Sequence, residues 1–454
     1  MKILLVKPNY DSHIITPPLG LGYISSYLQK FGVEALVIDG LREKLKMNEM
    51  VERILVQKPD VVGITCMTAF YNEVIALSRA LHEKGIKIVI GGPHPTFLPY
   101  QTLVDSLADY VICGEGEVAF LNLVEQNLCG DNIQGVYSLS NLKNEEQPII
   151  KAQVINNLDD IPFPDWVSLD PRSYPRAPHG AFMKGFPIGI IITSRGCPYE
   201  CTFCASPKLC DRKIRFRSPD NVVEEIKYLI NNFQIKEIHF EDDNLTLRRD
   251  NIEKLCYLLI GNGIKVNWAC PNGIRADKVD REIIQLMKDS GCYFFSYGIE
   301  SANNNILKNI KKRESIEVIE KAIEIADEVG ISTQGFFIFG LPGETAGTIE
   351  ENIVFAVKSK LSRAQFLILD VLPGSELWET LKGKFVPNWN KESYREPEWL
   401  PEGVTMEQLQ SAQSRAFRRF YLRPKIFWKL ARQVDYRQFF YFMKRIKDYR
   451  LLKK

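Results

Sequence analysis

The stretch IGIIITSRGCPYECTFC, residues 188–204, decides how the rest of this chain is interpreted. Its first six residues are apolar or β-branched, which is typical of a buried strand. Three cysteines with the spacing C-x3-C-x2-C follow that strand directly: Cys197, Cys201 and Cys204. Thiolates are soft ligands that hold iron–sulfur clusters or zinc. The pattern therefore predicts a metal site in the loop after a strand.

The number of cysteines bears on which metal the loop holds. Structural zinc normally takes four protein ligands, and Cys210, six residues further on, is the nearby candidate for the fourth. Three thiolates on a cubane cluster leave one iron open to an external ligand, as a substrate-binding cluster requires. A cluster on three cysteines is favoured, with zinc and Cys210 as the alternative.

Residues 186–375 around this loop alternate strand-like and helix-like patterns. Six such β/α units predict a partial TIM-type barrel, in which chemistry lies at the carboxyl ends of the strands. The expected strands are 188–193, 237–242, 266–270, 294–300, 334–340 and 364–372, and the expected helices lie near 219–232, 248–261, 279–290, 315–329 and 345–359.

Polar stretches occur at the ends of three of these expected strands. EDDN (241–244) ends the second, YGIES (297–301) ends the fourth, and FGLPGET (339–345) follows the fifth. Because carboxyl ends of neighbouring parallel strands meet at one edge, these stretches are expected to surround the cysteine loop.

The first 130 residues form an earlier series of the same kind. Five strand-like runs alternate with five helix-like stretches, which predicts a doubly wound, Rossmann-like domain. Glycine-rich stretches lie where strands end: PPLGLGYISSYL (17–28), GGPHPTFLP (91–99) and GEGE (114–117). Glycine lets the backbone approach a bulky ligand closely. The missing G-x-G-x-x-G after the first strand argues against NAD or FAD.

With these residues in view, the chain resembles the radical S-adenosylmethionine (SAM) superfamily, because CPYECTFC is similar to its cluster loop. The resemblance implies a [4Fe–4S] cluster whose open iron binds SAM, and an external electron donor of the flavodoxin or ferredoxin type. One electron would cleave SAM to a 5′-deoxyadenosyl radical, which abstracts hydrogen from substrate. No side chain is assigned as a catalytic residue. The implied SAM contacts are Phe203, Asp242, Asp243, Asn244, Glu300, Ser301, Gly340 and Pro342.

The N-terminal glycine stretches and the barrel together resemble the cobalamin-binding subclass of that superfamily. The resemblance covers the chain up to about residue 380 and implies a corrinoid between the sheet rim and the barrel mouth. Asp11-Ser12-His13 lacks the glycine of the D-x-H-x-x-G motif that supplies an axial histidine, so His13 is expected to be a loop residue. The implied cobalamin contacts are Pro18, Leu19, Gly20, Thr65, Gly91, Gly92, His94, Gly114, Glu115 and Gly116.

Two further regions fall outside these series. Residues 131–185 are polar and then rich in proline, which predicts a small hairpin and a linker. Residues 381–454 form a helical, aromatic-rich C-terminal region, and residues 411–454 hold 14 lysines and arginines against two acidic residues. Packing of these aromatics on the barrel is the simplest interpretation. Peripheral contact with an anionic membrane, or a lipid-like substrate, is the alternative, and nucleic acid is the least favoured partner.

Composition places the chain among globular proteins, with 45% hydrophobic and 25% charged residues. No apolar run is long enough to cross a bilayer, and the start reads as a strand and not as a signal peptide. Ten cysteines without such a signal favour metal binding in a reducing cytoplasm. A tRNA methylthiotransferase would need three further N-terminal cysteines, whereas Cys66, Cys113 and Cys129 stand singly.

Three functions remain open from the sequence. The first is a small-molecule C-methyltransferase that acts on an unactivated carbon through a 5′-deoxyadenosyl radical and methylcobalamin. The second is a radical SAM enzyme of the same subclass that cyclises, oxidises or rearranges its substrate without methylating it. The third is a corrinoid carrier or sensor without enzymatic activity, which the intact cysteine triad disfavours.

Overall fold

The structure is a computed structural model that describes residues 1–12, 14–130, 132–176, 183–389, 396–424 and 426. The chain forms two compact units, Met1–His179 and Gly180–Lys454. No helix among the described residues has the length and apolar character needed to cross a membrane.

The first unit is built on a six-stranded sheet in the order β2-β1-β3-β4-β5-β6. Its first five strands are parallel, and only β6 is antiparallel to its neighbour β5. The strands are β1 (Lys2–Lys7), β2 (Glu34–Asp39), β3 (Val61–Thr65), β4 (Lys87–Gly91), β5 (Tyr110–Ile112) and β6 (Val136–Tyr137). Central strands such as VVGIT of β3 are apolar throughout because helices cover both faces of the sheet.

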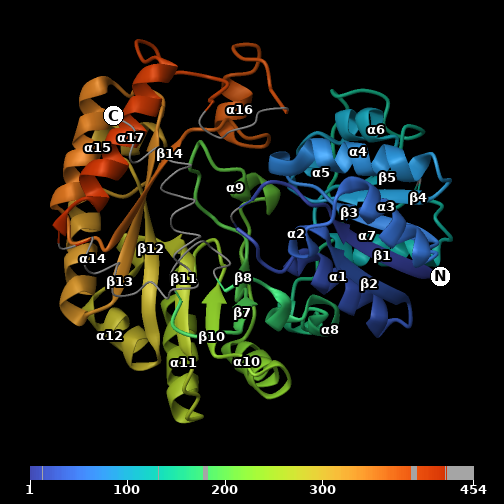
Figure 1. Ribbon diagram of the computed structural model, residues 1–454, viewed down its shortest axis with the longest axis horizontal. Coiled ribbons are helices and arrows are strands. Elements are labelled where there is room, and N and C mark those ends of the chain that lie inside the picture. The colour runs from blue at the N-terminus through green and yellow to red at the C-terminus, as the bar shows by residue number, and fades with distance from the viewer. Residues whose placement is uncertain (13, 131, 177–182, 390–395, 425, 427–454) are drawn as a thin grey trace. The chain divides into compact units, whose positions relative to one another are not determined.

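Helices cover this sheet in two layers (Figure 1). One layer holds α1 against α7 and α8, and the other holds α3, α4 and α6. The helices are α1 (Leu19–Lys30), α2 (Gly40–Glu43), α3 (Met47–Val56), α4 (Tyr71–His82), α5 (Pro93–Phe97), α6 (Pro99–Ser106), α7 (Gly116–Glu125) and α8 (Trp166–Leu169). The doubly wound domain predicted from the sequence is confirmed.

The segment after α7 differs from the predicted hairpin. Its two-residue strand β6 adds to the edge of the main sheet, and Tyr137 Oη donates a hydrogen bond to Ile150 O, 3.0 Å away. The backbone of Ala152 in turn donates to Cys113 O at 2.8 Å. The polar stretch therefore covers the open edge of β5, because that edge offers unpaired backbone groups.

The second unit is a curved parallel sheet in the order β14-β13-β12-β11-β10-β7, with helices along its outer face (Figure 1). The strands are β7 (Ile188–Ile191), β10 (Glu237–Phe240), β11 (Asn267–Ile274), β12 (Cys292–Glu300), β13 (Ser332–Phe339) and β14 (Arg363–Ile368). The long helices are α10 (Pro219–Phe233), α11 (Arg249–Gly261), α12 (Arg281–Asp289), α14 (Ile316–Val329), α15 (Ala346–Lys358) and α17 (Met406–Tyr421). The six β/α units of the predicted partial barrel are confirmed.

Shorter elements occupy the connections of this unit. They are β8 (Ser194–Arg195), β9 (Arg215–Phe216), α9 (Ser206–Leu209), α13 (Asn304–Asn309) and α16 (Glu376–Thr380). Local signals set the helix boundaries. Ser218 caps α10 through Asn221 N with proline at the first helical position, and Thr345 and Thr348 form a capping box on α15.

The amino ends of the strands are joined by the carboxylate of Glu237, which is fully buried. Its Oε2 accepts hydrogen bonds from the backbone of Lys184 (2.7 Å) and Gly185 (2.6 Å), just before β7. Its Oε1 contacts His239 Nε2 at 2.7 Å and accepts a hydrogen bond from Tyr293 of β12. One side chain of β10 thus ties three strands together at the end opposite to the cysteine loop.

The C-terminal helix α17 belongs to this unit. Phe417 and Phe420 both make edge contacts with the ring of Phe366 on β14. Gln413 donates to Phe366 O at 2.8 Å, and Tyr421 Oη bonds to the backbone of Ala364. The packing of the C-terminal aromatics on the barrel is confirmed for this helix, and Phe427, Trp428, Phe439, Phe440 and Tyr441 lie outside the described residues.

Candidate active site

The cysteine loop begins where β7 ends, and the carboxylate of Asp242 fixes its first residues. Asp242 Oδ1 accepts hydrogen bonds from Thr193 N (3.0 Å), Thr193 Oγ1 (2.8 Å) and Ser194 Oγ (2.6 Å). β8 then pairs antiparallel with β9, which returns from beyond the third cysteine. Gly196 has φ +102° and no room for a side chain, because an added Cβ would lie 2.2 Å from Lys213 O. The base of the loop is therefore held rigidly.

Residues from later in the chain hold the tip of the loop. Arg275 lies over the ring of Tyr199, 3.7 Å from its centroid. Glu200 forms ion pairs with both Arg212 and Arg313. Every one of these contacts involves the residues between Cys197 and Cys201, so this part of the loop has little conformational freedom.

The backbone of Thr202 is held on both sides. Its N–H donates to Ile310 O at 3.0 Å, and its carbonyl accepts from Leu377 N at 2.8 Å. Thr202 lies between the second and third cysteines, so the loop is braced along its whole length. Side chains that would bind a ligand are best held by a rigid frame of this kind.

The three thiols lie in this braced loop, and each is half-buried. Burial raises the pKa of all three, that of Cys204 to about 12, so without a metal they are protonated at neutral pH. Cys197 and Cys201 lie near enough to Cys204 for their charges to raise its pKa further. Among the described residues, no three His, Cys, Asp or Glu side chains converge on a single metal ion. Three soft ligands around one half-buried loop fit an iron–sulfur cluster, whose irons are spread over several corners.

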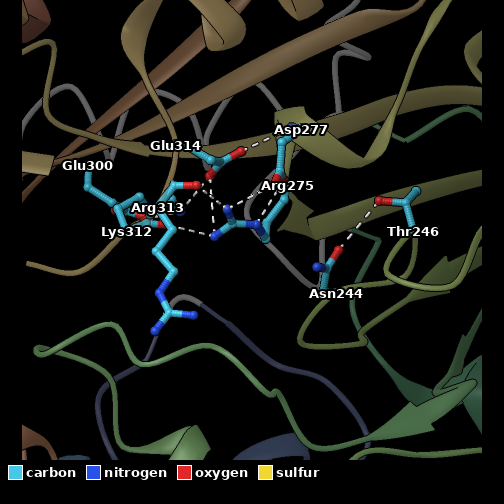
Figure 2. A network of polar contacts seen from close by, with 8 residues as sticks. All are labelled: Asn244, Thr246, Arg275, Asp277, Glu300, Lys312, Arg313 and Glu314. Carbon is cyan, nitrogen blue, oxygen red and sulfur yellow. Dashed lines mark hydrogen bonds and ion pairs between the residues drawn. The ribbon is translucent and has the colours of Figure 1, made fainter. Parts of the chain in front are cut away.

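A buried ionic network lies beside the loop, at the carboxyl end of β12 (Figure 2). Lys312 Nζ lies 3.1 Å from Glu300 Oε1 and 3.6 Å from Glu314 Oε2. Arg275 pairs with Asp277 at 2.9 Å and with Glu314 at 3.6 Å. Burial opposes the charge of Lys312, but the carboxylates of Glu300 and Glu314 outweigh it and raise the pKa of Lys312.

Ser301 and Gly340 are joined through a second buried network. Ser301 Oγ donates to Asn352 Oδ1 at 3.3 Å, and Asn352 Nδ2 donates to Glu344 Oε1 at 3.0 Å. Glu344 Oε2 accepts hydrogen bonds from the backbone of Gly340 and Leu341. The turn that contains Pro342 is closed by Glu344 N, which donates to Leu341 O. The stretches 297–301 and 339–345, distant in sequence, therefore form one side of the site.

This network gives the protein a specific pH dependence. Burial raises the pKa of Glu344 to about 7, although its three hydrogen bonds act in the opposite direction. Because the pKa is higher in the folded than in the unfolded chain, the stabilisation is complete below about pH 4 and is lost as the pH rises to about 7. We expect the free energy of unfolding to fall by roughly 3 kcal/mol over that range relative to Glu344→Gln. Urea unfolding at pH 5, 6, 7 and 8 measures this difference.

Glu351→Gln is the matched control, because Glu351 is exposed on the same helix α15. Its difference from the wild type should stay constant over the same range. A constant difference for Glu344→Gln as well would show that Glu344 titrates like an exposed carboxylate.

The residues expected near SAM occupy different environments. Asp243 is exposed and accepts from Ser206 Oγ at 2.9 Å, and Phe203 is half-buried in the cysteine loop. Asn244 is buried, and its Nδ2 has no hydrogen-bond partner within the described part of the chain. An unpartnered buried amide at a strand end fits contact with a polar ligand. Asp242 differs, because its carboxylate is occupied by Thr193 and Ser194; it acts on the loop and not toward a ligand.

The residues expected near cobalamin gather at the carboxyl edge of the first sheet. Cys66 N donates to Gly91 O at 2.7 Å, directly after Thr65 ends β3. Gly92 has φ +118°, and an added Cβ would lie 2.5 Å from Cys66 O. Gly114 N donates to Thr96 Oγ1 at 2.9 Å. The loops after β3, β4 and β5 are thus tied to one another.

The start of α1 completes this edge. Pro18 O accepts from Leu21 N and Gly22 N, so Leu19 and Gly20 form the first turn of the helix. Gly20 is exposed and has open space where a side chain would be, with no heavy atom within 4 Å of an added Cβ. A cradle for a large planar cofactor requires such space, so this edge fits cobalamin.

Three of the residues expected to contact cobalamin, His94, Glu115 and Gly116, have structural roles within the first unit. His94 is buried, stacks on Tyr71 with ring centroids 4.1 Å apart, and has its Nδ1 3.1 Å from Thr68 Oγ1. Burial lowers the pKa of His94 to about 4, so its ring is neutral. An added Cβ at Gly116 would lie 2.7 Å from Ile24, so this glycine packs α7 on α1. Glu115 is the N-cap residue of α7. His13 lies outside the described residues.

Sequence reasoning missed Arg275, which follows β11, and Lys312 and Arg313, which follow helix α13. A cluster of charges such as KKRE (311–314) is usually a solvated surface, and only Lys311 and Arg313 show such exposure.

Comparisons with known proteins agree with this geometry. The profile of the B12 binding domain matches residues 2–124, and the profile of the radical SAM superfamily matches residues 191–356. An uncharacterized methyltransferase of Pyrococcus horikoshii is 34% identical over 94% of both chains. An anaerobic magnesium-protoporphyrin IX monomethyl ester cyclase of Rubrivivax gelatinosus is 29% identical over 93% of this chain and 78% of its own.

A solved structure is similar over most of its length. The radical S-adenosylmethionine methyltransferase TsrM of Kitasatospora setae, solved with tryptophan and a SAM analogue, has a TM-score of 0.74. The alignment covers 92% of this chain and 89% of the other. At 18% identity, this likeness shows the fold alone.

Proposed function

Because this chain belongs to the B12-binding radical SAM family, we propose that it methylates an unactivated carbon of a small-molecule substrate. It is a radical SAM enzyme whose cofactors are a [4Fe–4S] cluster, SAM and cobalamin. When bound, these cofactors supply a 5′-deoxyadenosyl radical and a transferable methyl group. The observation that carries the proposal is the coexistence of a braced three-cysteine loop and a glycine-lined sheet edge in a chain 34% identical to a methyltransferase.

The protein's own residues orient and enclose the reaction. Cys197, Cys201 and Cys204 hold the cluster, with one iron left open for SAM. Asn244 Nδ2, which has no partner among the described residues, and the Glu300 carboxylate would contact SAM, and Lys312 keeps Glu300 in place. Rigid placement of these groups limits reaction of the radical with anything except substrate.

A second function is supported by the cyclase relative, whose sequence is 29% identical over 93% of this chain. In that case the substrate radical would form a ring or be oxidised, and no methyl group would be transferred. The two functions share every cofactor-binding feature described above, so the products must distinguish them.

The deciding experiment is carried out on anaerobically purified protein, reconstituted with iron, sulfide and hydroxocobalamin. SAM and a strong reductant are added, and mass spectrometry quantifies 5′-deoxyadenosine and S-adenosylhomocysteine together. Both products are expected, since S-adenosylhomocysteine requires transfer of the methyl group. 5′-Deoxyadenosine alone would support the non-methylating function, and neither product would contradict both.

The cobalamin site has a test that does not depend on activity. Leucine at Gly20 fills the open space at the sheet edge, so we expect the affinity for hydroxocobalamin to fall at least about tenfold, which corresponds to about 1.4 kcal/mol. Stability should not fall, because Gly20 is exposed in a helix and leucine favours helices more than glycine does. Absorbance titration with hydroxocobalamin and thermal unfolding measure the two effects.

Gly261→Leu is the matched control, since Gly261 is also exposed and helical with no heavy atom within 4 Å of an added Cβ. It lies on α11 of the second unit. If the two variants bind hydroxocobalamin with equal affinity, cobalamin does not bind at the start of α1.

The remaining partners follow from the chemistry. Cleavage of SAM consumes one electron, and we propose that an external donor of the flavodoxin or ferredoxin type delivers it to the cluster. The basic C-terminal segment could place the enzyme at an anionic membrane surface in the cytoplasm, with a lipid-like substrate as one class of small molecule. Binding to vesicles that contain anionic lipid, compared with a chain ending at residue 424, tests this role.

A further inference from the structure

Lys312 has an unusual position for a lysine. It is buried in the connection between α13 and α14, whereas its neighbour Lys311 is exposed and pairs with Glu376 at 2.7 Å. The ammonium of Lys312 contacts Glu300 and Glu314, as Figure 2 shows. Burial of an ammonium is unfavourable unless it is paired. Glu300 and Glu314 provide that pairing, so the fold holds a fixed positive charge at this position.

The connection that carries Lys312 makes three separate contacts with the cysteine loop or with the residues that support it. Ile310 O accepts from Thr202 N, and Arg313 pairs with Glu200. The carbonyls of Lys312 and Arg313 accept hydrogen bonds from Arg275, which lies over Tyr199. The backbone on both sides of Lys312 is therefore held against the part of the loop that carries Cys201.

The net charge of the bound cluster means that a nearby ammonium would change its reduction potential. A [4Fe–4S] cluster in its resting 2+ state carries one net negative charge with three thiolates, and one more after it accepts an electron. Net charge, hydrogen bonding and burial set the reduction potential of such clusters. A fixed positive charge nearby stabilises the reduced form more than the oxidised form, and low solvent exposure strengthens the effect.

We propose that Lys312 is a positioning residue whose buried ammonium raises the potential at which the cluster accepts its electron, while it holds the Glu300 carboxylate in place. This inference rests on the proposed cluster at Cys197, Cys201 and Cys204. It goes beyond that assignment because it names the residue that sets how readily the external donor can reduce the cluster.

The test uses reconstituted full-length enzyme and two readouts other than activity. Iron and sulfide per chain show whether the cluster has assembled, and a potentiometric titration followed by electron paramagnetic resonance gives its midpoint potential. Lys312→Met is expected to retain the cluster with a more negative midpoint. Lys312→Arg keeps the charge and should restore the midpoint, and Lys311→Met should leave it at the wild-type value.

A second neutral variant guards against misfolding. Lys312→Met combined with Glu314→Gln removes a carboxylate together with the ammonium, and its midpoint is compared with that of Glu314→Gln alone. The double variant is expected to have a more negative midpoint potential than Glu314→Gln alone. If both neutral variants assemble a cluster and its midpoint potential is unchanged in each, the proposal is overturned. Loss of iron from both, with iron retained in Lys312→Arg, also overturns it, because Lys312 would then serve assembly only. A wild-type protein without a cluster would contradict the proposed function itself.

Discussion

Replacing Cys201 with alanine abolishes reductive cleavage of SAM. The central thiolate of the loop is lost, and the remaining two cysteines cannot hold a cubane with a single open iron. We expect the rate of 5′-deoxyadenosine formation to fall by more than the roughly 10–100-fold that loss of an outer partner of a metal ligand causes. The measurement is 5′-deoxyadenosine by mass spectrometry, with iron and sulfide determined on the same reconstituted sample.

Cys210→Ala provides the control for this prediction. Cys210 is also half-buried, and alanine keeps its Cβ, which lies 3.0 Å from the position of an added Cβ at Gly196. The variant should retain iron and activity, since Cys210 is not one of the three ligands. Loss of the bound metal in Cys210→Ala as well as in Cys201→Ala, with zinc and no sulfide in the wild-type protein, would support the four-cysteine zinc site instead.

The second large effect concerns stability and arises at the other end of the barrel. Glu237→Ala removes the acceptor for the backbone of Lys184 and Gly185 and for the Tyr293 hydroxyl, and it removes the contact with His239 Nε2. Removing one member of a buried polar or ionic group costs about 3–5 kcal/mol. For a unit of this size, we expect the Tm of the second unit to fall by roughly 10 °C, as measured by scanning calorimetry.

Glu224→Ala is the comparison variant for this effect. Glu224 is exposed on α10, where it pairs with Lys227 at 2.8 Å. Exposed pairs of this kind contribute about 0.5 kcal/mol or less, so its transition should coincide with that of the wild type. If Glu237→Ala unfolds at the same temperature as Glu224→Ala, the tie between β7, β10 and β12 is not structurally important.

The strands and helices could be predicted because both units repeat one local pattern. Strands such as β3 and β7 are apolar runs bounded by polar turns, and amphipathic helices of ten or more residues separate them. These signals lie within a few neighbouring residues, where periodicity is informative. The edge strand β6 was missed because two residues carry no periodicity, and its pairing with β5 depends on contacts distant in sequence.

The sequence predicted where the site residues lie along the chain, but it did not predict which groups their side chains contact. The sequence placed Asp242 at the end of β10 correctly, but the direction of its carboxylate depends on where Thr193 and Ser194 lie. For the same reason Lys312 resembled a solvated lysine within a charged run. Burial of a charged side chain is decided by elements that pack against it from elsewhere in the chain.

The bracing of the cysteine loop also bears on how the enzyme is made. Glu200 meets Arg313 only after a further 113 residues have been added to the chain. At about 5–20 residues per second, the ribosome takes on the order of ten seconds to synthesise that stretch. During this interval the three cysteines have emerged or are emerging without their later supports, and their thiols are accessible to oxidants and stray metals. Delivery of the cluster is therefore best timed after release of the finished polypeptide, when the frame that receives it is complete.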